Sequence, residues 1–313
     1  MDKRKKLTHR MAIVMLAAGM AAVGHALPAR AESELIYVAP LFEYPIAPEE
    51  LPDLQTKSDW LMEHFWDSFN FKSTTNVDQN ALNDAFGVYS AAMMYASRAK
   101  ALASVENIVK SIKGNPAMTL QFAKAAEEAF YGPRAIGWSD EVYIPFLKAV
   151  IADKKLSDSR KARYVAQYDN IKANAIGAKF PKLRMTLRDG RHQDFQPSTD
   201  YTIVEIGNPD CDDCRFARMK LEMASDLKTM VEEKRLTISF IVADAVPEEE
   251  SDILTLLSDY PAAWITGISY GADDKLDIRQ TPTFYVLGKK GEILAKNLDV
   301  AGAVDMIRSI TGK

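Results

Sequence analysis

The sequence predicts two successive fold classes: an all-α domain over residues 58–176, then an α/β domain over residues 177–313 with a central mixed sheet flanked by helices. Apolar residues recur with a period near 3.6 before Gly177 and with a period of two directly after it. Candidate strands and helices then alternate to the end of the chain. With 47% hydrophobic and 26% charged residues, the 313-residue chain has a globular composition and is long enough for two domains.

The first 31 residues have the pattern of a secretory signal peptide. Four basic residues at positions 3–6 precede an apolar stretch, residues 11–23, and a small-residue site follows at Ala29-Arg30-Ala31. We expect cleavage near Ala31 and a periplasmic or secreted protein. An uncleaved anchor is the alternative, although a spanning helix needs about 20 apolar residues. No cysteine near the cleavage point could carry a lipid, so no stable membrane anchor is expected.

Cleavage would change the charge balance of the chain. It removes six basic residues and one acidic residue, so the net charge moves from −4 to −9. The remaining chain has no basic run or basic-aromatic stripe. No nucleic acid partner is therefore expected, and an anionic membrane surface would repel the protein.

Residues 32–57 are expected to form an extended lead-in, because they contain four prolines. From Ser58, which is expected to cap a helix, large apolar residues recur at helical spacing. Such stripes could line a ligand groove, but they more often form a core. The sequence assigns no role to this helical domain. The stripes are Trp60, Leu61, Phe65, Trp66, Phe69; Leu82, Phe86, Tyr89; Val105, Ile108, Ile112; Leu120, Phe122, Ala125, Phe130; Val142, Phe146, Leu147, Val150; and Tyr164, Val165, Tyr168, Ile171.

The second domain begins with strand-like alternation before an Asp189-Gly190 turn. We then expect strand 201–206, helix 211–231, strand 236–243, a helical insertion, strands 283–287 and 292–295, and helix 301–310. The helix over 211–231 is expected to bury one apolar stripe. Its members are Phe216, Met219, Met223, Leu227 and Met230.

The two cysteines, Cys211 and Cys214, form one C-x-x-C motif at the point where a predicted strand ends and a predicted helix begins. A disulfide closing so small a loop would add little stability, so reactivity explains the pair better. A thiolate at a helix N-terminus meets unsatisfied N–H groups and the positive end of the dipole, which lowers the pKa of the thiol. We expect Cys211 to be the exposed attacking thiol and Cys214 the shielded thiol that resolves the mixed disulfide.

The strand, the C-x-x-C that opens a helix, and the later segment Gln280-Thr281-Pro282-Thr283 resemble the thioredoxin superfamily, in particular its TlpA-like periplasmic branch of thiol–disulfide oxidoreductases. The resemblance covers residues 177–313 and implies a thioredoxin-like fold. It also implies that Pro282 is a cis-proline lying against the cysteine pair, with Thr281 offering backbone groups to an extended substrate. A strand-edge proline without a role is the alternative. The helical domain is similar to an uncharacterised domain that accompanies such modules in some Gram-negative anaerobes, which implies no activity.

Glu205 stands six residues before Cys211, where thioredoxins keep a buried acid. In that position its carboxyl would have a raised pKa and could take the proton from Cys214 during resolution. Side-chain alternation could instead point Glu205 to solvent.

Three acidic residues surround the thiols: Asp210 stands where the family has Trp, and Asp212 and Asp213 lie between the cysteines. Negative charge disfavours a thiolate and so favours the disulfide, which predicts a comparatively reducing couple. No metal is expected, since two thiolates without a second C-x-x-C or a His pair fall short of a zinc set. A peroxiredoxin is disfavoured because Asn208 occupies the place of its Thr or Ser.

These observations favour an enzyme that exchanges disulfides with exported proteins bearing thiols or disulfides, and that uses the Cys211–Cys214 pair in place of a cofactor. An electron donor, which the sequence does not identify, would reduce the cysteine pair again. The alternative is a redox-sluggish thioredoxin-like scaffold whose helical domain binds a protein or other ligand.

Overall fold

The structure is a computed structural model that describes residues 40–73 and 76–312. The expected signal segment and its cleavage site lie outside the described residues. Within these ranges, no helix combines the length and the apolar character needed to cross a bilayer.

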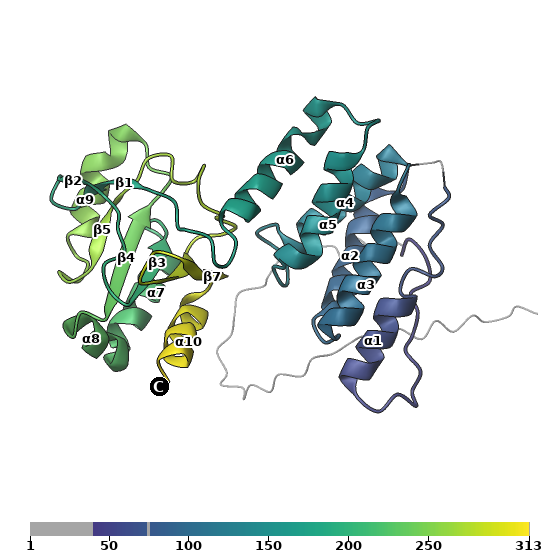
Figure 1. Ribbon diagram of the computed structural model, residues 1–313, viewed down its shortest axis with the longest axis horizontal. Coiled ribbons are helices and arrows are strands. Elements are labelled where there is room, and N and C mark those ends of the chain that lie inside the picture. Colours follow the sequence, from purple (N-terminus) through teal and green to yellow (C-terminus); the bar gives the residue numbers. More distant parts are fainter. Residues whose placement is uncertain (1–39, 74–75, 313) are drawn as a thin grey trace, which may run out of the picture. The chain divides into compact units, whose positions relative to one another are not determined.

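The N-terminal part of the described chain is helical, as predicted (Figure 1). Its helices are α1 (Leu54–His64), α2 (Gln79–Met93), α3 (Arg98–Ile112), α4 (Pro116–Phe130), α5 (Asp140–Ala152) and α6 (Asp158–Ala173). Four of them begin at a side-chain cap. The side-chain oxygens of Asp53, Asp78, Asn115 and Ser139 each accept a hydrogen bond from the backbone N–H three residues further on.

The predicted start of the first helix is wrong. α1 begins at Leu54, because Asp53 accepts the Thr56 N–H and caps the helix, so Ser58 is a buried residue inside α1. The helix also ends at His64, and Phe65 lies in the turns that follow. Residues 54–57, which were expected to belong to the extended lead-in, are therefore part of α1, and residues 32–39 lie outside the described residues.

Most of the predicted stripes form the core of the helical part, but the last one does so only in part, because α6 buries Tyr164 and Ile171 and leaves Val165 exposed. Phe86, Tyr89, Phe122 and Phe146 are completely buried. Phe86 lies at the centre, with its ring centroid 5.6 Å from that of Phe122 and 5.8 Å from that of Phe146. Tilted and edge-to-face ring contacts of this kind stabilise beyond the area they bury.

The C-terminal part contains a seven-stranded mixed sheet within the described residues, in the order β2-β1-β5-β4-β3-β6-β7. Its strands are β1 (Arg184–Leu187), β2 (His192–Asp194), β3 (Tyr201–Ile206), β4 (Leu236–Val242), β5 (Ile265–Ile268), β6 (Thr283–Gly288) and β7 (Ile293–Leu298). β3 pairs in parallel with β4 and antiparallel with β6, which places it inside the sheet. The residue pattern alone did not locate β5, because it indicated only a helical insertion between β4 and β6.

Helices cover one face of this sheet (Figure 1). They are α7 (Asp212–Met223), α8 (Ser225–Glu232), α9 (Glu250–Leu257) and α10 (Val300–Thr311). The single helix predicted over 211–231 is therefore two helices, divided at Ala224. Ile203, Phe240 and Phe284 belong to the core beneath the helices, whereas Val204 and Tyr285 belong to the core on the opposite face.

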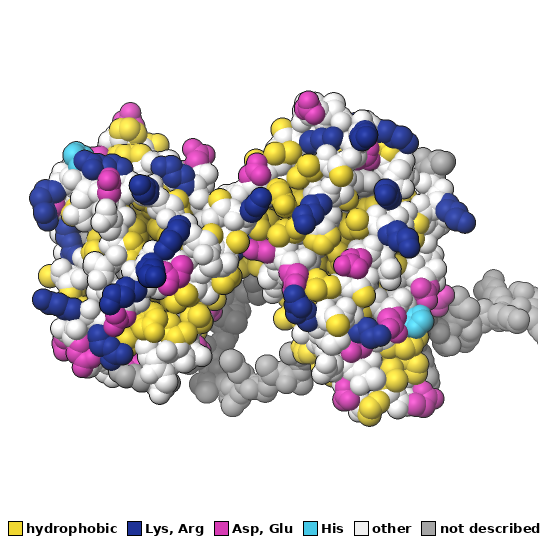
Figure 2. All heavy atoms as spheres, viewed as in Figure 1, with side chains coloured by type: hydrophobic (Ala, Val, Ile, Leu, Met, Phe, Trp, Pro, Cys, Tyr) yellow, Lys and Arg dark blue, Asp and Glu magenta, His cyan; other side chains and the backbone are white. Residues whose placement is uncertain are grey.

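The apolar stripe predicted for the interior of α7 is wrong in its first half. The side chains that α7 buries are Cys214, Ala217 and Leu221. Three larger members of the predicted stripe lie at the surface, where Phe216 is 55%, Met219 54% and Met223 77% exposed. Other hydrophobic side chains also reach the surface of both parts of the chain, among scattered charged groups (Figure 2).

Candidate active site

The two cysteines lie at the start of α7, directly after β3. Cys211 is the N-cap residue of α7, with its backbone still extended, and its carbonyl accepts the Arg215 N–H at 3.0 Å. Its side chain is partly exposed, whereas Cys214 is completely buried, and both are free thiols. The placement matches the expected division between an accessible and a shielded sulfur.

Gly207 makes room for the buried sulfur. A Cβ atom at this position would stand 2.7 Å from Cys214 Sγ and 3.3 Å from the ring of Phe240. A contact at 2.7 Å is too short for any larger residue without a shift of α7 or of the strand. Burial in this tight packing raises the pKa of the Cys214 thiol well above its usual range, because a thiolate there would be poorly solvated.

Pro282 enters the site from the neighbouring strand. The Thr281–Pro282 peptide bond is cis. Because the register of the sheet pairs Ile206 with Thr283, the chain leaving β3 and the chain entering β6 lie at the same edge. Thr281 is exposed at this edge and Pro282 is partly exposed. Both are therefore accessible to a substrate chain at the end of the sheet that carries the cysteines.

Glu205 points into the core beneath α7 rather than to solvent. It pairs with Phe240 of β4 and Phe284 of β6 in the sheet register, and its side chain is completely buried. Neither carboxylate oxygen has a hydrogen-bond partner among the described residues. Loss of solvation raises the pKa of Glu205 to about 8, with Arg218 opposing this shift and Cys211 adding to it.

Arg218 and Tyr260 complete the surroundings of Glu205, and sequence reasoning missed both. The Arg218 guanidinium carbon lies 4.7 Å from the centre of the Tyr260 ring, a cation–π arrangement. The sequence could have indicated that Arg218 belongs to the site, because it stands four residues after Cys214 and therefore lies on the same face of the helix. Tyr260 lies after α9 and carries no comparable signal. A buried acid, a thiol and an arginine thus form one cluster under the helix.

The acidic residues beside the thiols are partly neutralised. Arg215 makes an ion pair with Asp212, and its Nη1 atom is 3.4 Å from Asp210 Oδ1. These groups are exposed, so each pair is weak in water. Asp213 makes no ion pair within the described part of the chain. The prediction of a reducing couple counted three negative charges and did not include the positive charge of Arg215. Because Arg215 pairs with Asp210 and Asp212, Asp213 is the acidic residue between the cysteines whose charge is not compensated. The described residues also contain no group of three or more metal-ligating side chains.

Comparison with known proteins identifies the family of the helical part. A family model described as a domain of unknown function, DUF5106, matches residues 3–174, which is more than half of the chain. The chain belongs to this family. No curated protein matches the sequence.

Solved structures identify the fold of the C-terminal part. A thioredoxin-like protein from Bacteroides caccae is 23% identical, with a TM-score of 0.70, over 87% of this chain and 99% of that one. The thioredoxin domain of a thiol–disulfide oxidoreductase from Bacteroides vulgatus is 21% identical, with a TM-score of 0.36, over 44% of this chain and 97% of that one. The likeness to the Bacteroides caccae protein confirms the predicted thioredoxin-like fold.

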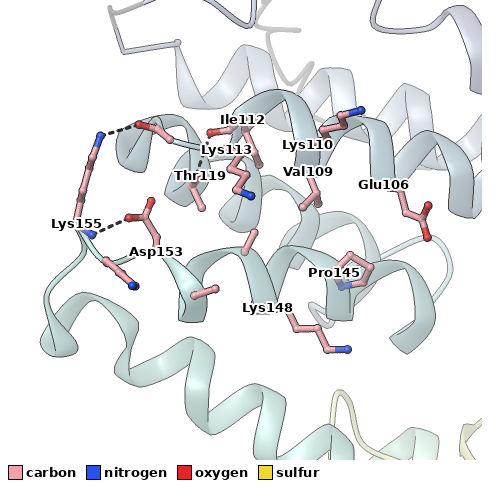
Figure 3. A pocket seen from close by; sticks show the side chains of 14 residues that line it. Glu106, Val109, Lys110, Ile112, Lys113, Thr119, Pro145, Lys148, Asp153 and Lys155 are labelled. Carbon is pink, nitrogen blue, oxygen red and sulfur yellow. Dashed lines mark hydrogen bonds between the residues drawn. The ribbon is translucent and has the colours of Figure 1, made fainter.

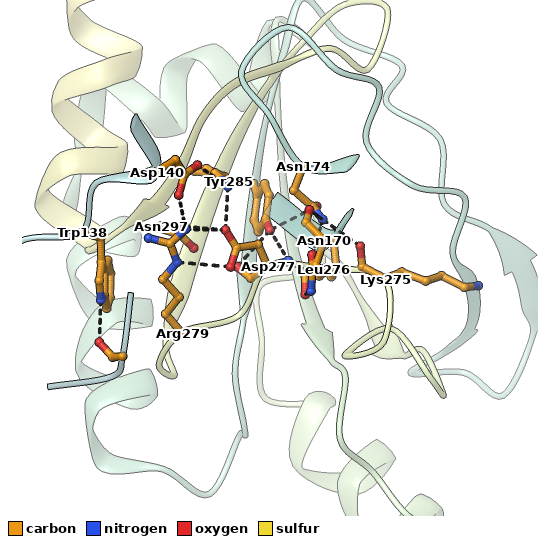
Figure 4. Close-up of polar contacts among 12 residues, drawn as sticks. Trp138, Asp140, Asn170, Asn174, Lys275, Leu276, Asp277, Arg279, Tyr285 and Asn297 are labelled. Carbon is orange, nitrogen blue, oxygen red and sulfur yellow. Dashed lines mark hydrogen bonds and ion pairs between the residues drawn. The ribbon is translucent and has the colours of Figure 1, made fainter. Parts of the chain in front are cut away.

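A buried ion cluster ties the DUF5106 segment to the loop that precedes Pro282 (Figure 4). Arg279 lies in this loop and pairs with Asp140 at the start of α5 and with Asp277, 2.8 Å away. Lys296 of β7 lies 2.8 Å from Asp140 and 2.6 Å from Asp277. The guanidinium of Arg279 also lies 4.5 Å above the ring of Tyr131. Two cations and two carboxylates therefore neutralise one another, with Arg279, Lys296 and Asp277 buried and Asp140 partly exposed.

The charges in this cluster fix the ionisation of its most buried acid. Burial by itself would raise the pKa of Asp277, but hydrogen bonding and attraction from Arg279 and Lys296 hold it below its usual range. A depressed pKa means that the cluster stabilises the folded chain above about pH 4, and that this stabilisation is lost as the pH falls through the folded value. At neutral pH the loop entering β6 is therefore held firmly.

Proposed function

We propose that the chain is an exported thiol–disulfide oxidoreductase that exchanges disulfides with other exported proteins through Cys211 and Cys214. The observation that carries the proposal is the arrangement under α7: an accessible thiol at the helix start, a second thiol buried one turn further in, and the carboxyl of Glu205 beneath them. A nucleophile needs access, whereas a resolving thiol needs protection from competing partners.

The exchange proceeds in two displacement steps. The Cys211 thiolate attacks one sulfur of the substrate disulfide, forming a mixed disulfide and releasing the other substrate sulfur as a thiolate. Cys214 then gives up its proton and attacks Cys211, which releases the second substrate thiol and leaves the Cys211–Cys214 disulfide. The substrate gains two electrons and two protons, and the cysteine pair loses them. An exported dithiol donor returns the pair to its reduced form and is itself oxidised to a disulfide.

Glu205 is suited to the second step. The high pKa of the Cys214 thiol is an obstacle to resolution, since the attacking form is the thiolate. A carboxyl with a pKa of about 8 is partly ionised at neutral pH and can accept the proton. The positive charge of Arg218 favours this ionised form. Thr281 and Pro282 would bind the substrate chain at the exposed sheet edge.

A trapping experiment tests the proposal. A Cys214→Ser variant lacks the resolving thiol, so discrete mixed disulfides should accumulate on Cys211 when the variant is produced in the exported compartment. The Cys211→Ser, Cys214→Ser double variant is the matched control and should trap nothing. If the single variant captures no partner, and the wild-type chain reduces no protein disulfide, the protein is a scaffold rather than an exchange enzyme.

A further inference from the structure

The helical part contains a groove between α3 and α5 that the redox chemistry does not use (Figure 3). Its volume is about 700 Å³, and 14 residues line it. An ion pair between Arg98 and Glu141 joins the two helices at their N-terminal ends. At the other end, Lys155 Nζ donates a hydrogen bond to the Gly114 carbonyl at 3.1 Å. The groove is therefore held at the C-terminal ends of the two helices, where Lys155 lines it.

The floor of the groove is apolar because small side chains face one another across it. Val109 and Ile112 of α3 lie on one side, and Pro145, Ala149 and Ala152 of α5 lie on the other. Alanine and proline leave space where a leucine or phenylalanine would fill the gap between two helices. An apolar ligand in this space would replace water that the floor cannot hydrogen-bond.

The rim of the groove is positively charged. Lys110, Lys113, Lys148 and Lys154 border it, and none of the four makes an ion pair within the described residues. Lys155 also lines the groove, and the acidic residues of the groove are Glu106 and Asp153, so cations outnumber carboxylates there. This concentration of cations occurs in a chain whose net charge is −4. Cations at helix C-terminal ends offset the helix dipole, which explains Lys110, Lys113 and Lys154 in part. Lys148 lies a full turn before the end of α5, so the dipole does not explain it.

The size of the groove favours a small molecule over a protein partner. Pockets for small molecules typically enclose about 300–1,000 Å³ and are mostly apolar with a few polar groups. A standard protein interface uses about 20–30 residues on each side, more than the 14 that line this groove.

We propose that this groove binds a long-chain carboxylate, with the acyl chain on the floor and the carboxylate beside the rim lysines. The apolar floor would bind the acyl chain of the ligand, and the unpaired lysines would attract its carboxylate. This site is separate from the cysteine pair, so the proposal does not rest on the proposed redox function.

Calorimetric titration of the whole chain tests the proposal with two probes that have similar alkyl chains and head groups of opposite charge. Dodecanoate below its micellar concentration should bind saturably at one site, and dodecyltrimethylammonium at least about tenfold more weakly. Dodecanoate binding should also weaken as salt is added. Equal affinity for the two probes, or no saturable binding of dodecanoate, would overturn the proposal.

Two variants and one control locate the binding. Ala149→Trp fills the groove and should weaken dodecanoate binding by at least about tenfold. Lys148→Glu reverses a rim charge and should weaken it by about fivefold. Lys124→Glu makes the same change at an exposed lysine of α4 outside the groove and should leave the affinity within about twofold. If Lys148→Glu and Ala149→Trp both bind like the wild type, or if an acidic amphipathic peptide displaces dodecanoate at lower concentration, the assignment to a carboxylate is wrong.

Discussion

Replacing Glu205 by glutamine should change how the stability of the protein depends on pH. The pKa of Glu205 is raised from its ordinary value of 4.5 to about 8 in the folded chain, whereas an unfolded chain keeps the ordinary value. Between these values the folded carboxyl keeps its proton while the unfolded one loses it. The free energy of unfolding therefore falls as the pH rises from about 4.5 to about 8, and this contribution is constant above that range. A glutamine at this position does not ionise, so the free energy of unfolding of the variant lacks this dependence on pH.

The magnitude follows from the two pKa values. A rise from 4.5 to about 8 corresponds to about 5 kcal/mol at high pH, since each tenfold change in an equilibrium is worth about 1.4 kcal/mol. Over the interval from about pH 5 to about pH 8 the expected loss is roughly 3 kcal/mol. That is a large fraction of the stability of an ordinary domain.

Equilibrium urea unfolding of the reduced chain, followed by circular dichroism at several pH values in this interval, measures the effect. The difference in unfolding free energy between Glu205→Gln and the wild type should grow with pH in favour of the variant. Glu232→Gln is the matched control, because Glu232 is an exposed glutamate of the same domain. Its curve should run parallel to the wild type. Parallel curves for Glu205→Gln as well would refute the raised pKa and with it the buried ionisable role.

Four further predictions concern the rest of the site. Gly207→Ala should destabilise the fold by about 1–3 kcal/mol and slow resolution by Cys214, because the new Cβ meets its sulfur; an unchanged urea midpoint would contradict this. Asp213→Asn should make the couple more oxidising by roughly 10–20 mV in a glutathione equilibration, and a shift the other way would reject the role given to the acidic residues. Asp140→Asn should lower stability by about 1–3 kcal/mol and raise KM for a protein disulfide while leaving kcat for a small disulfide unchanged, whereas equal effects on both substrates would argue against positioning of the loop before Pro282. Phe216→Ser should likewise raise KM for protein disulfides alone, because its exposed ring lies on α7, the helix that begins at the accessible thiol, and an unchanged KM would remove the α7 surface from substrate binding.

The sequence was sufficient for features that depend on local chemistry. The strand-to-helix position of the cysteines follows from an apolar run that ends before a C-x-x-C, and the helical core follows from periodic aromatic residues. The cis peptide at Pro282 and the thioredoxin-like fold were implied by resemblance to a family. The residue pattern did not locate β5, because this strand is only four residues long and contains Gly267, where an added Cβ would meet the Thr186 carbonyl oxygen of β1 at 2.4 Å. Its pairing is set by that close approach, which the sequence does not reveal.

The failed prediction for α7 has a similar cause. Hydrophobic bulk favoured Phe216, Met219 and Met223 for the interior, but the helix approaches the sheet too closely to bury them. The contact between Cys214 and Gly207 fixes this approach, so the small residue Ala217 faces the sheet instead. Binary patterning gives the hydrophobic faces of a helix, but the distance to the neighbouring layer decides which face is buried.

Stability alone gives no reason for an acid at position 205. The position lies between Phe240 and Phe284 in a core, where an isoleucine or valine would pack without any ionisation cost. Glu205 has no hydrogen-bond partner among the described residues to offset that cost, and Arg218 opposes it only in part. A buried group that is costly in the folded state and lies near the cysteine pair supports the proton-accepting role proposed for Glu205. The same reasoning separates Glu205 from Asp277, which is equally buried but is neutralised by two cations and therefore serves to hold the loop in place.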